Sequence, residues 1–374
     1  RTIDASIIGH TGVANLAAVS WSDMWTSCTA VFIGVSVLST FGGQEFGRGN
    51  KQMVGVWTQV AIIINLIVGV PVFISYMYTE QVITHLGHKD MAAKAGYYAQ
   101  VFALSIPSSI IRGRILDFFT LQKILHPGRN STVVLIVCNI LFGYFFVLGA
   151  GPIAWFLEFV DKEFKWDGFG FVACPWVSVA LDYLQLIYIY VAYMWRQRLH
   201  VECWPRLFDF RRVTLARLKE YSSMYIGLTL SCASDFWRMS LIGYMIGWLG
   251  DLEVAVFTTT YRETWLVGCF TGAFASGMKT NLAINIGRGD VLAAQQTVRL
   301  SLCLITIVNL SAAVVFTIFA REVAHIFSSD DSYIETSVHV RLGAAFVRER
   351  IASKSISKSF LKLHSAVDHS KIVS

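Results

Sequence analysis

Acidic side chains stand inside long apolar stretches of the sequence, where an ionised group is costly. Asp4, Asp182, Asp235 and Glu263 each lie within or beside one of these stretches. A carboxylate removed from water favours either its protonated form or a bound cation. These residues are therefore candidates for binding protons or cations. The competing interpretation is that they are hydrogen-bonded for structural reasons alone.

The surroundings of the four carboxylates differ. Asp182 has no basic residue within its own helical turn. Asp235 is followed by Trp237, whose ring face would attract a desolvated cation together with the carboxylate. Arg238 lies three residues from Asp235 on the same helical face, so a structural ion pair is an equally open interpretation. Glu263 follows a basic residue, but adjacent helical side chains point about 100° apart.

The stretches that hold these residues are long enough to cross a bilayer. Of 374 residues, 55% are apolar and 15% are charged, whereas a soluble domain carries about 25% charged residues. A membrane helix needs about 20 mostly apolar residues. Such stretches cover residues 16–38, 54–77, 97–119, 132–148, 171–194, 224–249, 254–278 and 298–319, with two partial ones at 2–9 and 333–347. The sequence predicts an all-α polytopic membrane protein.

The basic residues predict how these spans are oriented. If the spans alternate in direction, one set of loops carries twelve lysines and arginines and the other carries five. Seven of the twelve lie between residues 196 and 219. Because basic loops stay on the cytoplasmic side, residues 196–220 are predicted to form a cytoplasmic connection. The net charge of +6 thus indicates topology, and we expect no nucleic-acid partner.

The sequence shows no pattern typical of catalysis or metal binding. None of the seven cysteines has the spacing of a zinc site or a redox pair. A His-rich metal motif and a nucleophile constellation are also absent from the sequence. We therefore expect no metal, no cofactor and no enzymatic activity.

A glycine motif occurs twice in the chain. Phe46-Gly47-Arg48-Gly49-Asn50 follows the predicted span at 16–38, and Ile286-Gly287-Arg288-Gly289-Asp290 follows the span at 254–278, 240 residues later. Both copies fall on the predicted cytoplasmic side. This polarity indicates a parallel internal repeat, an architecture known in transporters.

The residues around these motifs resemble a known family. Residues 4–12 read D-A-S-I-I-G-H-T-G, residues 16–20 read L-A-A-V-S, and residues 43–50 read G-Q-E-F-G-R-G-N. They are similar to the motifs V-D-T-x-x-V-G-H-L-G, L-A-A-V-S and C-G-Q-A-F-G-A-G-N of multidrug and toxic compound extrusion (MATE) transporters. Pro107, Asn139 and the second glycine motif fit the family pattern as well. The ordered set covers residues 1 to about 345 and favours the eukaryotic type.

The resemblance implies twelve spans in two lobes of six helices around a central cleft. By this pattern, residues 1–195 form the N-lobe and residues 221–347 a partial C-lobe, while residues 348–374 form a divergent polar tail. About ten of the twelve spans are then expected, because the chain begins late in the first span and lacks counterparts of the last two. We expect a monomer in the plasma membrane or in a vacuolar or other internal membrane.

The resemblance also implies roles for individual residues. An aspartate at the position of Asp4 is a proton or cation site in the N-lobe, and Asp182 is a second candidate for coupling. Family members tend to have a glutamate at the position of Asp235, so Asp235, Trp237 and Glu263 are predicted to bind substrate, with Asp235 also a candidate for coupling. Structural roles are predicted for Gln44, Gly47, Gly49, Pro107, Asn139, Gly287 and Gly289.

Two functions of different chemistry fit this pattern. The first is antiport of small organic cations or drug-like compounds against protons or sodium across the lipid bilayer. The second is a flippase for lipid-linked oligosaccharides, which would need a strongly cationic cleft. Arg238 and Arg262 favour that alternative.

Overall fold

The computed structural model describes residues 10–87, 89–152, 166–204, 210–246 and 251–322, together with a few single residues. These single residues are Asp4, Ile7, Ile8, Trp155, Ile334, Glu335 and Val338. The partial spans predicted at 2–9 and 333–347 lie largely outside the described residues, and the predicted tail at 348–374 lies wholly outside them. The chain divides into two compact units, Arg1–Phe236 and Trp237–Ser374, which we call the N-terminal and C-terminal units.

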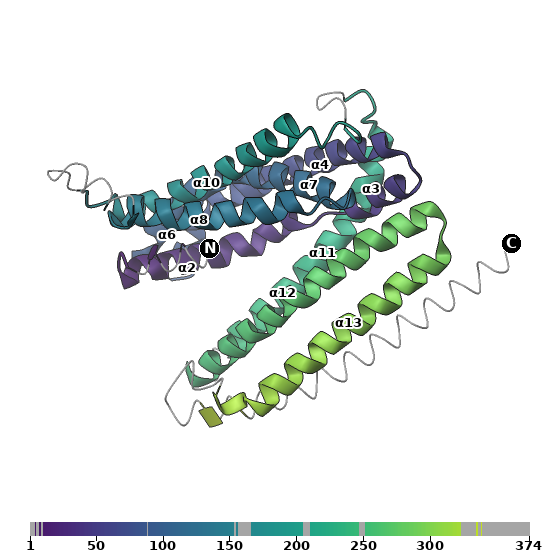
Figure 1. Ribbon diagram of the computed structural model, residues 1–374. Helices are drawn as coiled ribbons and strands as arrows, with labels where there is room; N and C mark the ends of the chain where they lie inside the picture. The colour runs from purple at the N-terminus through teal and green to yellow at the C-terminus, as the bar shows by residue number, and fades with distance from the viewer. Residues whose placement is uncertain are drawn as a thin grey trace. The chain divides into compact units, whose positions relative to one another are not determined.

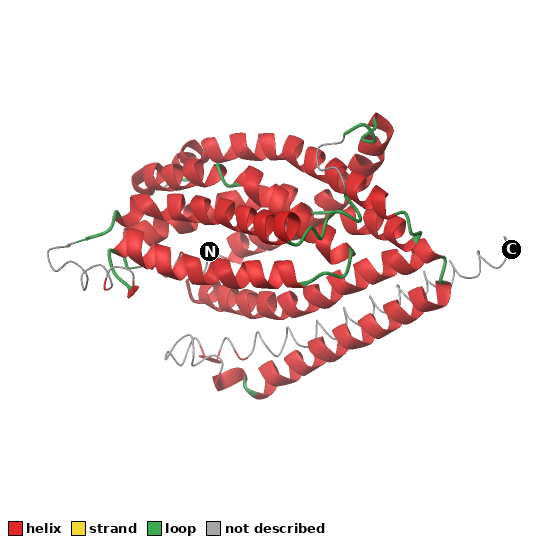
Figure 2. Ribbon diagram, turned by 45° about the horizontal axis from the view of Figure 1, so that its top comes forward, coloured by secondary structure: helices red, strands yellow, loops and turns green. Residues whose placement is uncertain are grey.

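The described part of the N-terminal unit consists of helices that pack side by side (Figures 1 and 2). The helices are α2 (Val13–Gly34), α3 (Leu38–Gly47), α4 (Lys51–Met77), α5 (Thr79–His85), α6 (Lys89–Ala103), α7 (Ile106–Leu121), α8 (His126–Leu148), the 3₁₀ turn η1 (Gly170–Val172), α10 (Ala173–Ile189), its π-helical continuation η2 (Tyr190–Arg196), and most of α11 (Leu215–Ile246). Helix α4 packs against α2, α3, α6 and α7. Its residues Val54, Trp57, Val60 and Ala61 belong to the largest buried cluster.

The C-terminal unit contains the end of α11 and two long helices, α12 (Asp251–Arg288) and α13 (Val291–Ile318). Helices α12 and α13 pack against each other as an antiparallel pair (Figure 1). Asn285 donates to Thr297 across the pair at 3.0 Å. Among the described residues, five complete predicted spans each coincide with one helix and two with a pair of helices, apart from a few residues between helices or at span ends. The span at 171–194 coincides with η1, α10 and η2, and residues 247–249 of another span lie outside the described residues.

Two predicted spans are each divided into two helices. The span at 16–38 breaks between α2 and α3, where Arg114 of α7 donates to the carbonyl of Val35 at 3.0 Å. Because the last carbonyls of a helix lack partners within it, this contact stabilises the break. The span at 97–119 is divided between α6 and α7. Pro107 lies in the first turn of α7, where its missing N–H removes no helical hydrogen bond.

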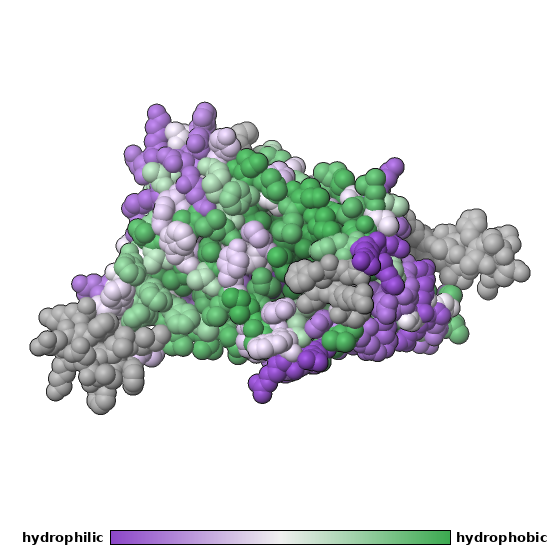
Figure 3. All heavy atoms as spheres, turned by 90° about the horizontal axis from the view of Figure 1, so that it is seen from above, coloured by the Kyte–Doolittle hydropathy of each residue, from purple (hydrophilic) through white to green (hydrophobic). Residues whose placement is uncertain are grey.

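The molecule has the surface of an integral membrane protein. Among the described residues, five helical stretches are long and apolar enough to cross a bilayer. Apolar residues dominate the middle of the face shown in Figure 3, and hydrophilic residues gather toward its edges. Helices α6 and α7 fall outside this set because they have only 15 and 16 residues. Helices α11 and α12 also fall outside it, and both carry charged residues within their predicted spans.

The predicted connection is anchored to the N-terminal unit. Cys203 and Trp204 are buried in the same cluster as α4, and the ring of Trp204 meets that of Phe118 edge-on at 5.6 Å. A β-carbon on Gly55 of α4 would lie 2.6 Å from the carbonyl oxygen of Cys203, so the glycine permits this close approach. Lys51 also pairs with the carboxylate of Glu202. The first part of the connection is therefore packed structure rather than a free linker.

The two glycine motifs adopt the same turn. Gly49 and Gly289 have φ angles of 81° and 75°, a region that glycine occupies without steric cost. In the first turn, the N–H groups of residues 49 and 50 donate to the carbonyls of residues 46 and 45 at 3.1 and 2.9 Å. In the second turn, residues 289 and 290 donate to residues 286 and 285 at 3.0 and 3.1 Å. Both turns are Schellman caps, and the sequence repeat is also a structural repeat at this point.

Candidate functional site

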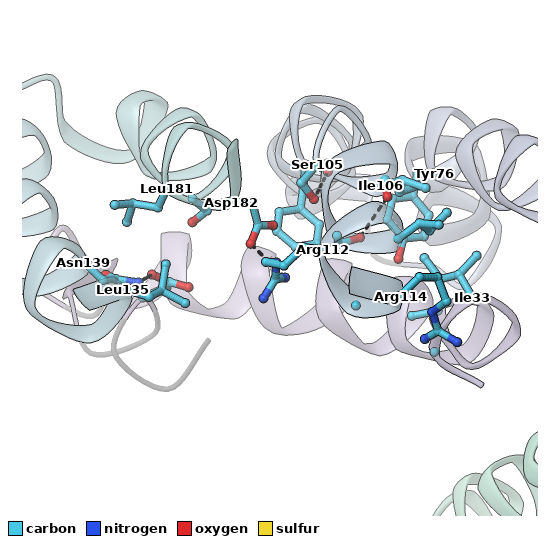
Figure 4. Close-up of a pocket in the computed structure, with 18 residues that line it drawn as sticks. Ile33, Tyr76, Ser105, Ile106, Arg112, Arg114, Leu135, Asn139, Leu181 and Asp182 are labelled. Carbon is cyan, nitrogen blue, oxygen red and sulfur yellow. Dashed lines mark hydrogen bonds and ion pairs between the residues drawn. The ribbon is translucent and has the colours of Figure 1, made fainter. Parts of the chain in front are cut away.

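The N-terminal unit contains a cavity of about 470 Å³ (Figure 4). Its lining comes from α2, α4, α6, α7, α8 and α10, with Asp4 contributed from before α2. The break between α6 and α7 contributes Ser105, and the end of α2 contributes Gly34. The helix breaks that interrupt the predicted spans therefore lie at the wall of this cavity.

Asp4 is one of the two carboxylates among the described residues of the lining. Its side chain is 9% exposed, and its Oδ1 accepts a hydrogen bond of 2.9 Å from Nδ2 of Asn139 on α8. Asn139 was predicted as a structural residue, and its place beside Asp4 gives it a further role in orienting the carboxylate. The Oδ1 atom of Asn139 is buried without a hydrogen-bond partner in the described chain.

Asp182 of α10 is the second carboxylate, and it faces Arg112 of α7 (Figure 4). Nη2 of Arg112 lies 3.2 Å from Oδ1 of Asp182. The two side chains are 22% and 17% exposed, so the pair is partly removed from water. This partner was not predicted, because Arg112 lies on another helix, 70 residues away in the sequence, and no local spacing connects it to Asp182. The sequence signal that could have indicated it is the position of Arg112 inside the predicted span 97–119, because a charged residue within a span usually has a partner.

Arg114 also lines the cavity but is held differently. Its side chain is 7% exposed and bonds to the carbonyl of Val35 at the end of α2. Nη1 of Arg114 lies 3.4 Å from the carboxylate of Asp117, one helical turn away. The spacing of three residues on one helix brings these two side chains together. Figure 4 places Arg114 beside Ile33 rather than beside Asp182.

Three serines add oxygen atoms to the lining. Ser105, Ser109 and Ser178 each donate a hydroxyl hydrogen to a carbonyl of the preceding turn, at 2.8, 2.9 and 3.2 Å. A hydroxyl that donates in this way keeps lone pairs that can accept from or coordinate a ligand. Together with the two carboxylates and Asn139, these hydroxyls place several oxygen atoms in a lining that is otherwise largely apolar. Oxygen ligands suit a proton or a hard cation.

Asp235 and Trp237, two of the substrate-binding residues predicted from the sequence, are not among the described residues that line this cavity. Asp235 and Trp237 are both exposed on α11, and Trp237 is 42% accessible. Glu263 lies on α12, and its side chain is outside the described residues. The prediction that these three residues form a binding site therefore stays a prediction.

The remaining motif residues occupy the two glycine turns. Gln44 and Gly47 lie in the last part of α3, and the carbonyl of Gln44 accepts from the N–H of Arg48 at 3.0 Å. Gly287 lies at the end of α12. Glu45 adds side-chain bonds to the first turn by accepting from Arg48 and Asn50 at 2.7 and 3.1 Å.

Comparison with known proteins agrees with this architecture. The family model named MatE matches residues 1–145 and 228–361, one segment before the connection and one after it. The chain belongs to the MATE family.

Relatives of this MATE protein occur in fungi and animals. An uncharacterised transporter of Schizosaccharomyces pombe is 26% identical over 331 residues, which cover 87% of this chain and 58% of the relative. Multidrug and toxin extrusion protein 1 of Xenopus tropicalis is 20% identical over 338 residues, with 89% and 55% covered. The chain thus spans little more than half the length of these curated relatives.

A solved structure shows the same fold. The crystal structure of the eukaryotic MATE transporter AtDTX14 superposes with a TM-score of 0.73 at 17% sequence identity. The match covers 91% of this chain and 72% of the other. The prediction of a MATE-like, all-helical membrane fold is thereby confirmed.

Proposed function

We propose that this chain is the transporting part of a secondary antiporter that exports organic cations or other xenobiotics by alternating access. Protons or sodium ions entering the N-terminal cavity drive the export. The observation that carries the proposal is that Asp4 and Asp182, far apart in the sequence, line the same cavity. The named animal relative is a multidrug and toxin extrusion protein, which supports a drug-like solute.

The chemistry of the cavity suits a coupling ion better than a large solute. Its volume is about 470 Å³, and carboxylate, amide and hydroxyl oxygens make up part of a lining that also contains apolar side chains and two arginines. A partly buried carboxylate is stabilised by binding a proton or a small cation, because either one offsets the hydration that the charged group has lost. The organic solute is assigned to Asp235, Trp237 and Glu263, whose acid and aromatic groups suit a desolvated organic cation.

The proposal is tested by transport driven by a pH gradient. The protein is reconstituted into liposomes loaded with a fluorescent organic cation, and efflux is followed after the gradient is imposed. Asp4→Asn and Asp182→Asn should each abolish gradient-driven efflux while leaving binding of the dye intact, because asparagine mimics the protonated acid. Asp90→Asn, at an exposed carboxylate in the first turn of α6, is the matched control and should transport normally.

If both cavity variants retain full gradient-driven efflux, the two carboxylates are structural and the proposal fails. Asp235→Asn should instead weaken dye binding. An unchanged dye affinity in Asp235→Asn would contradict the assignment of the organic-cation site to α11.

The second candidate function is a lipid-linked oligosaccharide flippase. The observation that favours it is that the guanidinium groups of Arg112 and Arg114 contribute to the cavity lining. A cationic lining attracts the phosphates of a lipid-linked substrate. Transfer of a fluorescent lipid pyrophosphate between leaflets, without export of the organic cation, would replace the antiporter with the flippase.

A further inference from the structure

Arg112 places a positive charge inside a cavity whose carboxylates are candidates for cation binding. Its guanidinium reaches from α7 to Asp182 of α10, and both side chains line the cavity (Figure 4). An arginine cannot lose its proton under physiological conditions. Its charge therefore stays in the cavity whatever the state of the neighbouring acids.

The contacts of Arg112 are fewer than those of its neighbour. Arg114 is held by a backbone carbonyl and by Asp117 on its own helix. For Arg112, the contact found in the described chain is the single 3.2 Å bond to Asp182. Its Nε, like that of Arg114, is buried without a hydrogen-bond partner among the described residues, so the difference lies in the guanidinium Nη contacts. Arg112 is thus anchored through the carboxylate that a cation would use.

We propose that Arg112 is a tethered cation that competes with the incoming ion for Asp182. In the state seen here, the guanidinium takes the place of a bound cation on this carboxylate. A proton or sodium ion then binds by exchange, and Arg112 must leave Asp182 as the ion arrives. This inference rests on the cation site of the proposed function and makes Arg112 the residue that sets its affinity.

The exchange has a consequence for selectivity. Removing the guanidinium takes away the positive charge that lies 3.2 Å from the Asp182 carboxylate, so any small cation should bind there more tightly. A lysine at the same place keeps the charge but loses the planar fork of the guanidinium, so it should compete in part. The increase in cation affinity on removal of the guanidinium must also depend on Asp182, because Asp182 is the carboxylate that the guanidinium occupies.

The experiment measures equilibrium binding of radioactive sodium to the purified protein in detergent. The wild type is compared with Arg112→Met, Arg112→Lys, Asp182→Asn and the double variant Arg112→Met with Asp182→Asn. Arg112→Met should bind sodium about tenfold more tightly, which corresponds to about 1.4 kcal/mol. Arg112→Lys should lie between Arg112→Met and the wild type. The double variant should bind no more tightly than Asp182→Asn.

A chemical substitution checks the same point without relying on a charged side chain. In Arg112→Ala, added methylguanidinium should compete with sodium and restore weak binding, whereas the wild type should respond far less. Circular dichroism and gel filtration confirm that each variant is folded. The double variant removes both charges of the pair, so it avoids leaving one buried charge unpaired.

The outcomes separate this inference from the proposed function. If the wild type binds sodium through Asp4 and Asp182 but Arg112→Met binds with unchanged affinity, the competition is refuted and the cation site stands. A gain in Arg112→Met that persists in the Asp182→Asn background also overturns the exchange. If neither the wild type nor any folded variant binds sodium or responds to a pH gradient, the proposed cation site fails as well.

Discussion

The two glycine turns have the same backbone but very different surroundings. In the first, Gly49 leads into α4, and 39% of the residues in the most apolar stretch of α4 are buried. In the second, Gly289 leads into α13, and no residue in the most apolar stretch of α13 is buried. The N-terminal turn also carries a docked segment, since Lys51 and Gly55 contact residues of the connection.

This difference shows that the turn and its packing are decided separately. A Schellman cap needs only a residue with positive φ and two backbone bonds within six residues, so it forms wherever the local sequence permits. Burial of the following helix depends on which distant segments meet it. For α4 these segments are α2, α3, α6, α7 and residues 203–204 of the connection.

The largest expected effect on stability is the difference between replacing Trp204, in the N-terminal unit, and replacing Trp265, in the C-terminal unit. Trp204 is 7% exposed and packs on Phe118 and Gly55, whereas Trp265 of α12 is 65% exposed. Trp204→Ala should destabilise the protein by about 3–5 kcal/mol, because it leaves a cavity in the core. Trp265→Ala should cost less than about 0.5 kcal/mol.

Unfolding of both tryptophan variants in detergent micelles, followed by denaturant titration, measures the difference. Equal losses in the two variants would show that the connection is not packed as described. Retained stability in Trp204→Ala would refute the anchoring of the connection directly.

An intermediate effect should be common to both units. Gly49→Ala and Gly289→Ala should each cost about 1–2 kcal/mol, because a residue with a β-carbon is strained at positive φ. An added β-carbon meets nothing within 4 Å at either position, so the cost arises from the backbone alone. The midpoints of thermal unfolding should fall by similar amounts.

Asparagine substitutions provide the matched control for the two turns. Gly49→Asn and Gly289→Asn should cost less than the alanine variants, because asparagine tolerates the left-handed region. A loss of stability at only one of the two glycines would show that the two turns are not equivalent.

The smallest expected effect is a pH dependence confined to the connection. Burial, reinforced by the charge of Arg198, lowers the pKa of His200 from its ordinary value of 6.5. The unfolded state therefore takes up a proton before the folded state does as the pH falls. Stability contributed by the neutral imidazole is full above the ordinary value and declines as the pH falls from there toward the lowered pKa.

His200→Gln should remove this decline while leaving stability near pH 8 almost unchanged. The measurement is the unfolding midpoint of wild type and variant between pH 8 and pH 5.5. Parallel curves for the two proteins would contradict the role assigned to His200.

Much of the cavity could be anticipated from the sequence, but its central contact could not. Asp4 and Asp182 stand out because each is a carboxylate within an apolar stretch, and Asn139 stands out by its motif. The pairing of Asp182 with Arg112 joins residues on α10 and α7 that no local period connects. A search for helical neighbours finds Arg114 and Asp117, which are three residues apart, and misses the partner across the helix interface.

The spans, their membrane character and the two glycine turns follow from the sequence alone. These features depend on residues close together in the chain: apolar runs of sufficient length, and a glycine that accepts a positive φ angle. The sequence predicted residues 196–220 only as a basic connection, because charge is the one property that composition shows there.

The tertiary structure alone decided which segments share a core and which charges meet. Cys203 and Trp204 are buried because the absence of a side chain at Gly55 leaves room for them on α4. Arg112 reaches Asp182 because α7 packs against α10. Such contacts arise from the packing of helices that are distant in sequence, and no local pattern determines that packing.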